Sequence, residues 1–566
     1  MNILKKLFPF IVILIFSFFT YKPLLNPGFF PIHDDTQVAR VYEMAKALSD
    51  GMFPVRWVSD LGYGYGYPIF NFYSPLPYYV GGFLDLSGLD SLNATKLTMF
   101  LGIILSGFSM YLFAKELWGK RGGLLASVFY IYAPYHAVEV YVRGDIAEFW
   151  AYSFIPLIFY AAFKIYKEQK LFYVFLFALS YAAIITSHNL TAMMITPFII
   201  FFMLYFLVKK VKRKKTSVLF FSSFVLGICL SAFYSIPVFL EMSYTNVLSQ
   251  VGGGANFRDH FVCLNQFWTS TWGYGGSARG CFDGVSFMVG KYHIFFSLLI
   301  FTLSLVAIFG KKYLDILRKE KEKVFLIPLF VFFFVFSLFL MLDLSRPIWE
   351  ILKPMEFLQY PWRFLIISSF SSSVIVGSSF FILDKFLKNK TFGFLLYLTI
   401  IIFIVLVSAK FFVPQIILSK TAEDYTSSYN LKWITSKISD EYMPGDFQKP
   451  KSFEEVADWN KFDPQSLEIT NLYQKTGEIS LNVDAKKDLN VILPLAYYPS
   501  WKAYVNGKNV NLVPSSKGVY LNLTKGVSEV KLTFGQTPVQ KLSNLVSIAG
   551  VLILIAGIIR LKPKYE

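Results

Sequence analysis

The stretch LTAMMITPFIIFFMLYFLV, residues 190–208, contains no charged residue and is followed directly by the basic run KKVKRKK, residues 209–215. A helix needs about 17–25 predominantly apolar residues to cross the hydrocarbon core of a bilayer. Lys and Arg beside such a helix favour the cytoplasmic side of the membrane. The stretch therefore predicts a membrane-spanning helix that ends in the cytoplasm.

The composition extends this prediction to the whole chain. Of its 566 residues, 55% are hydrophobic and only 16% are charged, and the mean hydropathy is +0.49. A soluble protein usually carries about 25% charged residues. We therefore predict an α-helical polytopic membrane protein, and the basic, uncleaved apolar N-terminus is read as its first anchor. The twelve predicted spans are residues 7–22, 95–114, 122–134, 148–163, 171–187, 190–208, 217–239, 293–310, 324–342, 364–383, 392–412 and 543–559.

The distribution of charge gives the expected orientation. Seven connections on one side of the predicted membrane hold 26 Lys and Arg against 7 Asp and Glu. Their net charge of 26 − 7 = +19 is larger than the net charge of the whole chain, +17. The positive-inside rule then places both termini in the cytoplasm of a plasma-membrane protein. The basic runs can contact anionic membrane lipids, and they are not interleaved with base-stacking aromatic residues. We therefore expect no nucleic-acid partner.

All the long loops fall on the other, extracytoplasmic side. The domain prediction is a membrane module over 1–412 with a large first outer loop (23–94), an outer domain over 413–542, and a last helix with a cytoplasmic tail over 543–566. The later half of 413–542 alternates between apolar and polar residues, and Asn506-Gly507 is a strong hairpin signal. This pattern predicts a β-sandwich-like, β-rich domain.

The first outer loop contains FFPIHDDTQVARVYE, residues 29–43. From Thr36 onward the apolar spacing predicts an amphipathic helix lying in the membrane interface, with Arg40 toward its polar side. Asp34 or Asp35 would then be an acidic cap at the N-terminus of this helix. Two aspartates beside His33 at a membrane surface also fit a functional role.

Three further clusters lie on the same side. LGYGYGYPIFNFYSPLPYY, residues 61–79, is a shaped loop whose rings, such as Tyr73, form either an interfacial aromatic belt or a wall for a sugar. APYHAVEVYVRGDIAEFWA, residues 133–151, places charged groups beside hydrocarbon, where they are costly unless paired or facing a wet cavity. TSHNL, residues 186–190, is a tight reversal whose histidine is either structural or functional. The candidates from the last two clusters are Arg143, Asp145, Glu148, His188 and Asn189.

Two later segments complete the set. Cys263 and Cys281 either form a disulfide on the oxidising side or remain free thiols. KPMEFLQYPWRFL, residues 353–365, places Glu356 and Arg363 just before a predicted span, where the arginine could also extend to lipid head groups.

Carboxylates and arginines gathered at a membrane surface suit an anionic head group on a lipid tail. A sugar on a polyprenyl phosphate has this form, and the planar guanidinium of arginine matches phosphate oxygens. The phosphate-binding candidates are Arg40, Arg56, Arg143, Arg258 and Arg363. Asp34 or Asp35 would act as the general base on the acceptor hydroxyl, with His33 positioning it. The same two aspartates are candidate ligands of a divalent metal, Mg²⁺ or Mn²⁺, that bridges carboxylate and phosphate.

The sequence also resembles known families. HDD, GYGYP followed by FNFYSPLPYY, RGDIAE, SHN, WGYGG, YPWR and YYPSWKAYVNGK are similar to segments of membrane proteins labelled "6-pyruvoyl-tetrahydropterin synthase-related" and of the YfhO-like family. The arrangement of spans and outer loops resembles the GT-C glycosyltransferases. That resemblance implies a GT-C-like membrane module, a lipid-linked sugar donor, inversion at the anomeric carbon and an essential first-loop acid, here Asp34 or Asp35. Nothing in the sequence resembles a soluble pterin enzyme.

Three functions remain as hypotheses. The first is a glycosyltransferase that acts on an extracytoplasmic glycan, lipid or protein acceptor. The second is a lipid or glycan transporter or flippase, although the predicted spans are poor in the central charges that transporters use. The third is a non-catalytic protein of envelope assembly.

Overall fold

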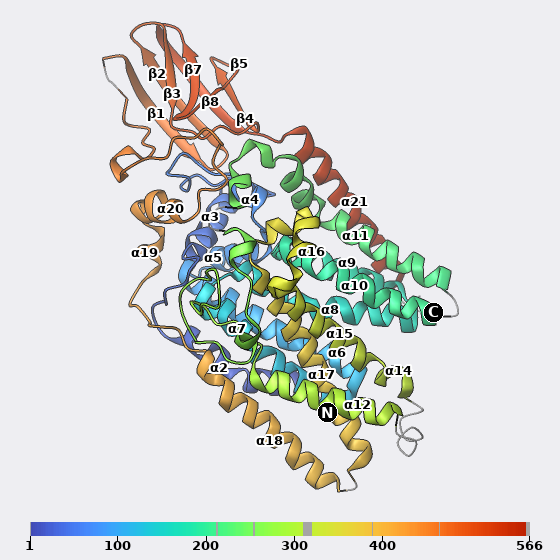
Figure 1. Ribbon diagram of the computed structural model, residues 1–566. Coiled ribbons are helices and arrows are strands. Elements are labelled where there is room, and N and C mark those ends of the chain that lie inside the picture. The colour runs from blue at the N-terminus through green and yellow to red at the C-terminus, as the bar shows by residue number, and fades with distance from the viewer. Residues whose placement is uncertain are drawn as a thin grey trace.

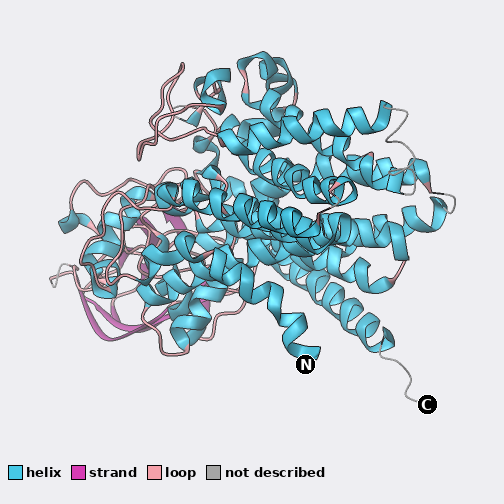
Figure 2. Ribbon diagram, turned by 90° about the horizontal axis from the view of Figure 1, so that it is seen from below, coloured by secondary structure: helices cyan, strands magenta, loops and turns pink. Residues whose placement is uncertain are grey.

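The structure, a computed structural model, describes residues 2–210, 213–252, 255–309, 320–387, 389–462 and 465–561. Most of two predicted basic segments, 311–323 and 560–566, therefore lies outside the described residues. Long helices run side by side, and eight β-strands gather at one end of them (Figure 1, Figure 2). The start of α1 and the end of α21 both lie at the opposite end from the strands (Figure 1).

The long helices account for the predicted membrane spans. Within the described residues, eight helices are long and apolar enough to cross a membrane, and a bent N-terminal pair and two shorter apolar helices accompany them. In the part of the chain that the structure describes, each predicted span overlaps one of these helices or the bent N-terminal pair, so the polytopic helical class is confirmed. The long helices are α1 (Asn2–Phe16), α6 (Ser91–Ile131), α8 (Ile146–Glu168), α9 (Leu171–Ser187), α10 (Asn189–Lys209), α11 (Arg213–Leu240), α12 (Lys291–Phe309), α15 (Leu326–Met341), α17 (Leu365–Phe386), α18 (Lys390–Ser408) and α21 (Pro538–Leu561).

The second and third predicted spans share the single element α6. Its helical geometry is broken at Gly119, where φ is 81° and ψ is 179°. That left-handed φ is readily adopted by glycine because it has no Cβ. The chain therefore changes direction at Gly119, where the prediction expected a short connecting loop.

The centre of the helical region is the packing of α17 against α6. In the most apolar window of α17, 94% of the residues are buried, and glycines let the two backbones approach closely. A Cβ atom added at Gly377 would lie 2.9 Å from the carbonyl oxygen of Gly122, and one added at Gly122 would lie 2.5 Å from that of Gly377. Small residues commonly allow such close helix contacts in membranes.

The first predicted outer loop folds into short helices that lie between the strands and the long helices (Figure 1). The prediction placed Arg40 of helix α3 (Gln37–Ser49) toward its polar side, and the expected exposure of Arg40 is wrong, while the position of α3 relative to a membrane stays a prediction. Arg40 is 4% exposed and Glu43 is 1% exposed, because α3 packs against α5 and α6. The short helical elements are α2 (Phe18–Tyr21), η1 (Lys22–Leu25), α4 (Ile69–Phe72), α5 (Leu76–Leu86), α7 (Pro134–Val138), η2 (Glu139–Arg143), η3 (Met242–Tyr244), η4 (Val247–Gln250), η6 (Phe257–Asp259), η7 (Leu264–Phe267), α14 (Lys321–Val324), η9 (Asp343–Ser345), α16 (Arg346–Ile351), η10 (Lys353–Leu358), η11 (Pro361–Phe364), η12 (Ala409–Phe411), α19 (Ala422–Thr426), η13 (Asn430–Thr435), α20 (Ser436–Ile438) and η14 (Phe453–Glu455).

The β-rich domain consists of two antiparallel sheets. One has the strand order β1-β2-β8-β4-β5 and the other β3-β7-β6. Burial alternates along β2, as expected for strands with one face in a core. The predicted hairpin is present between β4 and β5, where Asn506 and Gly507 both have positive φ. The strands are β1 (Leu467–Lys475), β2 (Glu478–Ala485), β3 (Leu489–Leu493), β4 (Trp501–Val505), β5 (Lys508–Val510), β6 (Val513–Ser515), β7 (Gly518–Leu523) and β8 (Gly526–Phe534).

The β-rich domain shares a hydrophobic core with the first loop. The ring of Trp57 packs edge-on against Trp501, with 5.6 Å between the ring centroids, and lies 5.5 Å from Phe534. Trp57 is only 1% exposed. Large buried aromatic rings contribute strongly to packing energy. The first loop is therefore held between the sheets and the helices.

The close contact of α6 and α17 can be tested by enlarging one glycine. We expect Gly377→Leu to destabilise the protein by about 1–3 kcal/mol or more, because overpacking a close contact forces the backbones apart. The measurement is thermal unfolding of the detergent-purified protein. Gly445→Ala is the control, since a Cβ at Gly445 meets nothing within 4 Å of it among the described atoms. Equal unfolding temperatures for both variants would contradict the role of this contact.

Candidate functional site

A cavity of about 740 Å³ lies where the first loop meets the ends of the long helices. Pockets of roughly 300–1,000 Å³ are typical of ligand sites. Residues far apart in the sequence line it. The sequence-predicted candidates among them are His33, Asp34, Arg40, Tyr73, Arg143, Asp145, His188, Asn189 and Arg363.

The turn Arg143-Gly144-Asp145 contributes Arg143 and Asp145 to the cavity wall, and we call this part of the wall the first polar end. The π-helical turn η2 ends at Arg143, and Asp145 begins α8 by accepting a hydrogen bond from the backbone N–H of Glu148 at 3.0 Å. Gly144 between them has φ 66°, and a Cβ there would lie 2.4 Å from the side chain of Ile32. Only glycine fits this reversal. The reversal lets the arginine and the aspartate meet side by side.

Arg143 is the centre of a buried ion-pair network. Its Nη2 donates to Asp145 Oδ2 at 2.9 Å, its Nη1 donates to Glu148 Oε2 at 2.8 Å, and Nη1 also donates to Glu139. The other oxygen of Glu148 accepts a bond from the hydroxyl of Tyr135 at 2.7 Å. All the charged members are less than 7% exposed. Buried charges persist when they are paired in this way.

Asp34 is attached to the same turn through its backbone. The N–H of His33 donates to the carbonyl of Val142 and that of Asp34 to the carbonyl of Arg143, both at 3.1 Å. This pairing brings the first loop to the start of α8. It places Asp34 on the cavity wall beside the ion-pair network.

The other two members of the HDD motif do not have the predicted contacts. The Nε2–H of His33 donates to the carbonyl of Tyr274 at 2.8 Å, so its bond goes to the cysteine-containing loop and not to Asp34. Asp35 is not among the lining residues, and its Oδ2 lies 3.7 Å from the Nζ of Lys420. The residue that caps α3 is Thr36, so neither aspartate is the N-cap.

Arg363 and His188 approach the network from two other helices. Arg363, at the start of α17, has its Nε 3.4 Å from Glu148 Oε2, while its Nη1 donates to the carbonyl of Leu358 at 3.2 Å. His188 lies between α9 and α10, and its Nδ1 bonds the hydroxyl of Thr191 at 2.8 Å and accepts from the Thr191 backbone N–H at 3.3 Å. These contacts orient both side chains.

The electrostatic environment separates the carboxyl groups into two kinds. Burial, and next the charge of Asp145, raises the pKa of Asp34. Burial also raises the pKa of Glu139 well above its ordinary value. For Asp145, burial is the largest single influence and raises the pKa, but Arg143, His188, Arg363 and the hydrogen bond from the Glu148 backbone together outweigh it, so the pKa is lowered. The pKa values of Asp34 and Asp145 therefore shift in opposite directions, as expected for groups with different partners.

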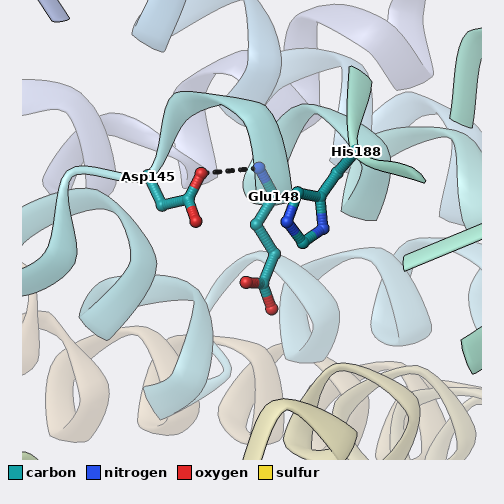
Figure 3. Close-up of side chains that lie close together, drawn as sticks. All are labelled: Asp145, Glu148 and His188. Carbon is teal, nitrogen blue, oxygen red and sulfur yellow. Dashed lines mark hydrogen bonds between the residues drawn. The ribbon is translucent and has the colours of Figure 1, made fainter. Parts of the chain in front are cut away.

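Three oxygen and nitrogen donors lie close enough together to hold a cation. Single ligand atoms of Asp145, Glu148 and His188 lie within 4.8 Å of one another. Figure 3 shows the two acidic side chains at the start of α8 with the ring of His188 beside them. Carboxylate oxygens and imidazole are common ligands of divalent metals. This set differs from the sequence-predicted ligands, Asp34 and Asp35.

The remaining candidates lie outside the cavity lining. Arg56 is buried and donates to Asn71, to Asn544 and to the carbonyl of Phe233. Arg258 pairs with Glu350 at 3.1 Å, and Glu356 pairs with Lys353 at 3.2 Å. Each of these charges has a partner away from the site.

Cys263 and Cys281 are joined in a disulfide with their Cα atoms 5.5 Å apart. The loop that this disulfide closes borders the cavity through Gly276 and Ser277. The disulfide is one of the two alternatives left open by the sequence.

The sequence reasoning missed a second set of lining residues. Residues 438–442 of the segment that precedes the strands line the cavity. The sequence analysis named no candidate residue in this region. A signal was present in ISDEYMP, residues 438–444, which pairs Asp440 with Glu441 as HDD pairs two aspartates.

Removing the central arginine tests whether the network holds the site together. We expect Arg143→Met to destabilise the protein by about 3–5 kcal/mol, because the buried carboxylates lose their counter-ion. Arg258→Met is a matched control, since its pair with Glu350 is exposed and should contribute at most about 1 kcal/mol. Denaturant titration in detergent measures both. Similar losses for the two variants would contradict a special role for Arg143.

Comparison with known proteins finds distant similarity to one protein sequence and to two solved structures. An uncharacterized protein of Lactococcus lactis subsp. cremoris (strain MG1363) is 27% identical over 247 residues, which are 42% of this chain and 40% of that relative. The arabinofuranosyltransferase AftD from Mycobacteria is similar in structure over 73% of this chain and 27% of its own, with 10% identity and a TM-score of 0.44. The Archaeoglobus fulgidus oligosaccharyltransferase, solved in complex with Zn and sulfate, is similar over 80% of this chain and 59% of its own, with 12% identity and a TM-score of 0.36.

A family model gives the firmer assignment. It is described as "6-pyruvoyl-tetrahydropterin synthase related domain; membrane protein" and matches residues 70–413. This range includes the Arg143 turn, His188, the disulfide loop and Arg363. The chain therefore belongs to the 6-pyruvoyl-tetrahydropterin synthase-related family of membrane proteins.

Proposed function

We propose that this protein is a membrane glycosyltransferase that moves a sugar from a polyprenyl-phosphate donor to an acceptor in the same cavity. The observation that carries the proposal is the composition of that cavity. Arginines and carboxylates lie at one end, and the ends of two apolar membrane helices form a wall. A ligand with an anionic head and a lipid tail fits both parts.

The apolar wall supports a lipid-borne substrate. Leu190 and Met193 of α10 and Val238 and Phe239 of α11 line the cavity. Phe239 is 70% exposed and continues the apolar surface of a helix that is long enough to span the membrane. A lipid tail passing along this wall can stay in hydrocarbon while its head group reaches the polar end.

Arg363 is the proposed ligand of the donor phosphate. The hydrogen-bonding groups given above for Arg143 are already taken by three carboxylates. Nε of Arg363 lies 3.4 Å from Glu148 Oε2 but makes no hydrogen bond among the described residues. Arg363 is 7% exposed and lines the cavity. A guanidinium in this state can donate to a phosphate oxygen.

Asp34 is the proposed general base. The acceptor hydroxyl oxygen attacks the anomeric carbon while its proton passes to the carboxylate of Asp34. The bond from the anomeric carbon to the phosphate oxygen breaks, and its electron pair leaves with the phosphate. This single displacement inverts the anomeric carbon. The raised pKa of Asp34 suits a base that must take a proton near neutral pH.

A divalent cation, Mg²⁺ or Mn²⁺, is part of the proposal, with Asp145, Glu148 and His188 as its ligands in place of the aspartates chosen from the sequence. An incoming phosphate adds negative charge to a wall where Arg143 is already occupied by carboxylates. A bound cation would offset that charge.

The membrane orientation completes the proposal. The strands and the cavity would face the extracytoplasmic side of the plasma membrane, with both termini in the cytoplasm. The excess of Lys and Arg in alternate connections supports this direction. The start of α1 and the end of α21 lie away from the strands, in agreement with this direction (Figure 1).

The two adjacent aspartates provide a matched test. We expect Asp34→Asn to lower sugar transfer by about 10²–10⁴-fold, the range of a lost general base, with the protein still folded. Asp35→Asn should keep most of the activity, because Asp35 faces Lys420 and not the cavity. The measurement is transfer of labelled sugar from a polyprenyl-phosphate donor in reconstituted membranes. Undiminished transfer by Asp34→Asn, or lipid transport without any sugar transfer, would reject the proposal.

Metal removal tests the cation. We expect a chelator to abolish transfer and Mg²⁺ or Mn²⁺ to restore it. His188→Ala should raise the metal concentration needed for half of maximal activity, because one of the three ligands is lost. Full transfer after chelation would show that the guanidinium groups are sufficient for the phosphate.

A further inference from the structure

The cavity wall has a second group of polar residues besides those of the Arg143 turn, which we call its second polar end. It is formed by Arg40 of α3 and by Ser439, Asp440 and Glu441, which follow α20. Tyr73 lines the same region. The proposed chemistry of the donor phosphate uses none of these four polar side chains.

The Nε–H group of Arg40 is a hydrogen-bond donor without a partner among the described residues. Its Nη2 donates to the hydroxyl of Ser439 at 3.0 Å, and its guanidinium lies 4.1 Å from the centre of the Tyr73 ring. The side chain is 96% buried, and its Nε has no hydrogen-bond partner in the part of the chain that the structure describes. Buried polar atoms are nearly always hydrogen-bonded, so an unpaired Nε–H on a cavity wall indicates a ligand.

The carboxylates of Asp440 and Glu441 provide hydrogen-bond acceptors, and nearby basic side chains balance their negative charges. Glu441 Oε1 accepts from Ser439 at 3.1 Å, and the charge of Arg40 acts on the same carboxylate. Asp440 Oδ2 accepts from the hydroxyl of Tyr63 at 2.8 Å and pairs with Lys449 at 2.7 Å. Each acid is therefore balanced by one base. This wall favours a neutral ligand with several hydroxyl groups over an acidic or a basic one.

Residues 438–442 are held in place without a ligand, because hydrogen bonds fix the chain on both sides of them. Ser436 accepts a bond from the backbone N–H of Tyr63 at 3.0 Å. The backbone N–H of Tyr442 donates to the hydroxyl of Tyr67 at 3.3 Å, and the carbonyl of Met443 accepts from Asn246 at 2.8 Å. Preformed walls of this kind are usual in ligand sites.

We propose that Arg40, Ser439, Asp440 and Glu441 form the acceptor subsite and that they bind a neutral carbohydrate. This inference rests on the proposed glycosyltransferase function and names the class of its acceptor. Carboxylate oxygens accept hydrogen bonds from sugar hydroxyls, and the free Nε–H of Arg40 donates to one of them. An anionic head group or an acidic peptide would meet two carboxylates here.

The position of Asp34 agrees with this assignment. Asp34 lines the same cavity as Arg143 and Arg40, and the charges of both arginines act on its carboxyl group. A base in this place can reach a hydroxyl that the acceptor presents toward the donor.

The test measures binding to the full-length protein in detergent by intrinsic fluorescence. One arm titrates neutral oligosaccharides: gluco-, galacto-, manno- and N-acetylglucosamine oligomers. The other arm titrates decaprenyl phosphate. We expect at least one neutral oligosaccharide to bind, and we expect Glu441→Gln and, separately, Asp440→Asn to weaken that binding about tenfold or more. Neither variant should change the affinity for decaprenyl phosphate.

Two further variants show whether the oligosaccharide and decaprenyl phosphate titrations report on different parts of the cavity. Arg363→Lys should weaken only the binding of decaprenyl phosphate, because it alters the proposed phosphate ligand and leaves the second end intact. Glu454→Gln, at an exposed glutamate in the same region, should change neither arm. Failure of decaprenyl phosphate to bind, with oligosaccharide binding intact, would reject the donor assignment and leave the subsite standing.

Three outcomes would overturn the subsite. The first is that no neutral oligosaccharide binds. The second is that acidic oligosaccharides or lysine peptides bind where the neutral oligosaccharides do not. The third is that Glu441→Gln and Asp440→Asn leave oligosaccharide binding unchanged while both proteins unfold at the wild-type temperature.

Discussion

The buried pairing of Arg143 with Glu139, Asp145 and Glu148 is the interaction on which the rest of the site depends. A guanidinium this close to membrane helices is costly unless every charge near it is satisfied. That requirement explains the local backbone: a π-helical turn, a glycine with positive φ and an aspartate that begins α8. Through Glu148 the same network reaches Arg363 at the start of α17. Two helices that are far apart in sequence are thereby fixed relative to each other.

The second constraint is the position of the first loop. Its inner side pairs with the Arg143 turn through the backbone of His33 and Asp34, and its other side shares a core with the β-rich domain. The first loop is thus held between the long helices and the β-rich domain. These contacts keep its short helices ordered. The β-rich domain contributes to the cavity indirectly, since the segment leading into it supplies residues 438–442.

These two constraints give the cavity its polarity. At one end, two arginines and several carboxylates suit an anionic group, and an apolar wall leads from there to the membrane helices. At the other end, charges cancel in pairs and hydroxyl and carboxylate oxygens predominate. Asp34 lines the same cavity, and burial raises its pKa. A two-substrate reaction needs such an arrangement, because donor and acceptor must approach one another without competing for the same contacts.

The sequence by itself determined the properties that depend on local composition. A membrane span requires a long apolar segment with charges beside it, so segments such as 190–208 could be found from the sequence. The β-hairpin could be found from the turn residues Asn506-Gly507. The sequence also picked out His33, Asp34, Arg143, Asp145, His188 and Arg363, because ionisable groups stand out next to hydrocarbon. Tertiary structure alone decided that Asp34 and not Asp35 faces the cavity, and that Arg40 is buried and not at a surface. It alone decided that Asp440 and Glu441 line the site and that Arg56, Arg258 and Glu356 do not. The physical reason is that these outcomes depend on which elements pack against each other across hundreds of residues, and no local pattern of charge or hydropathy records that choice.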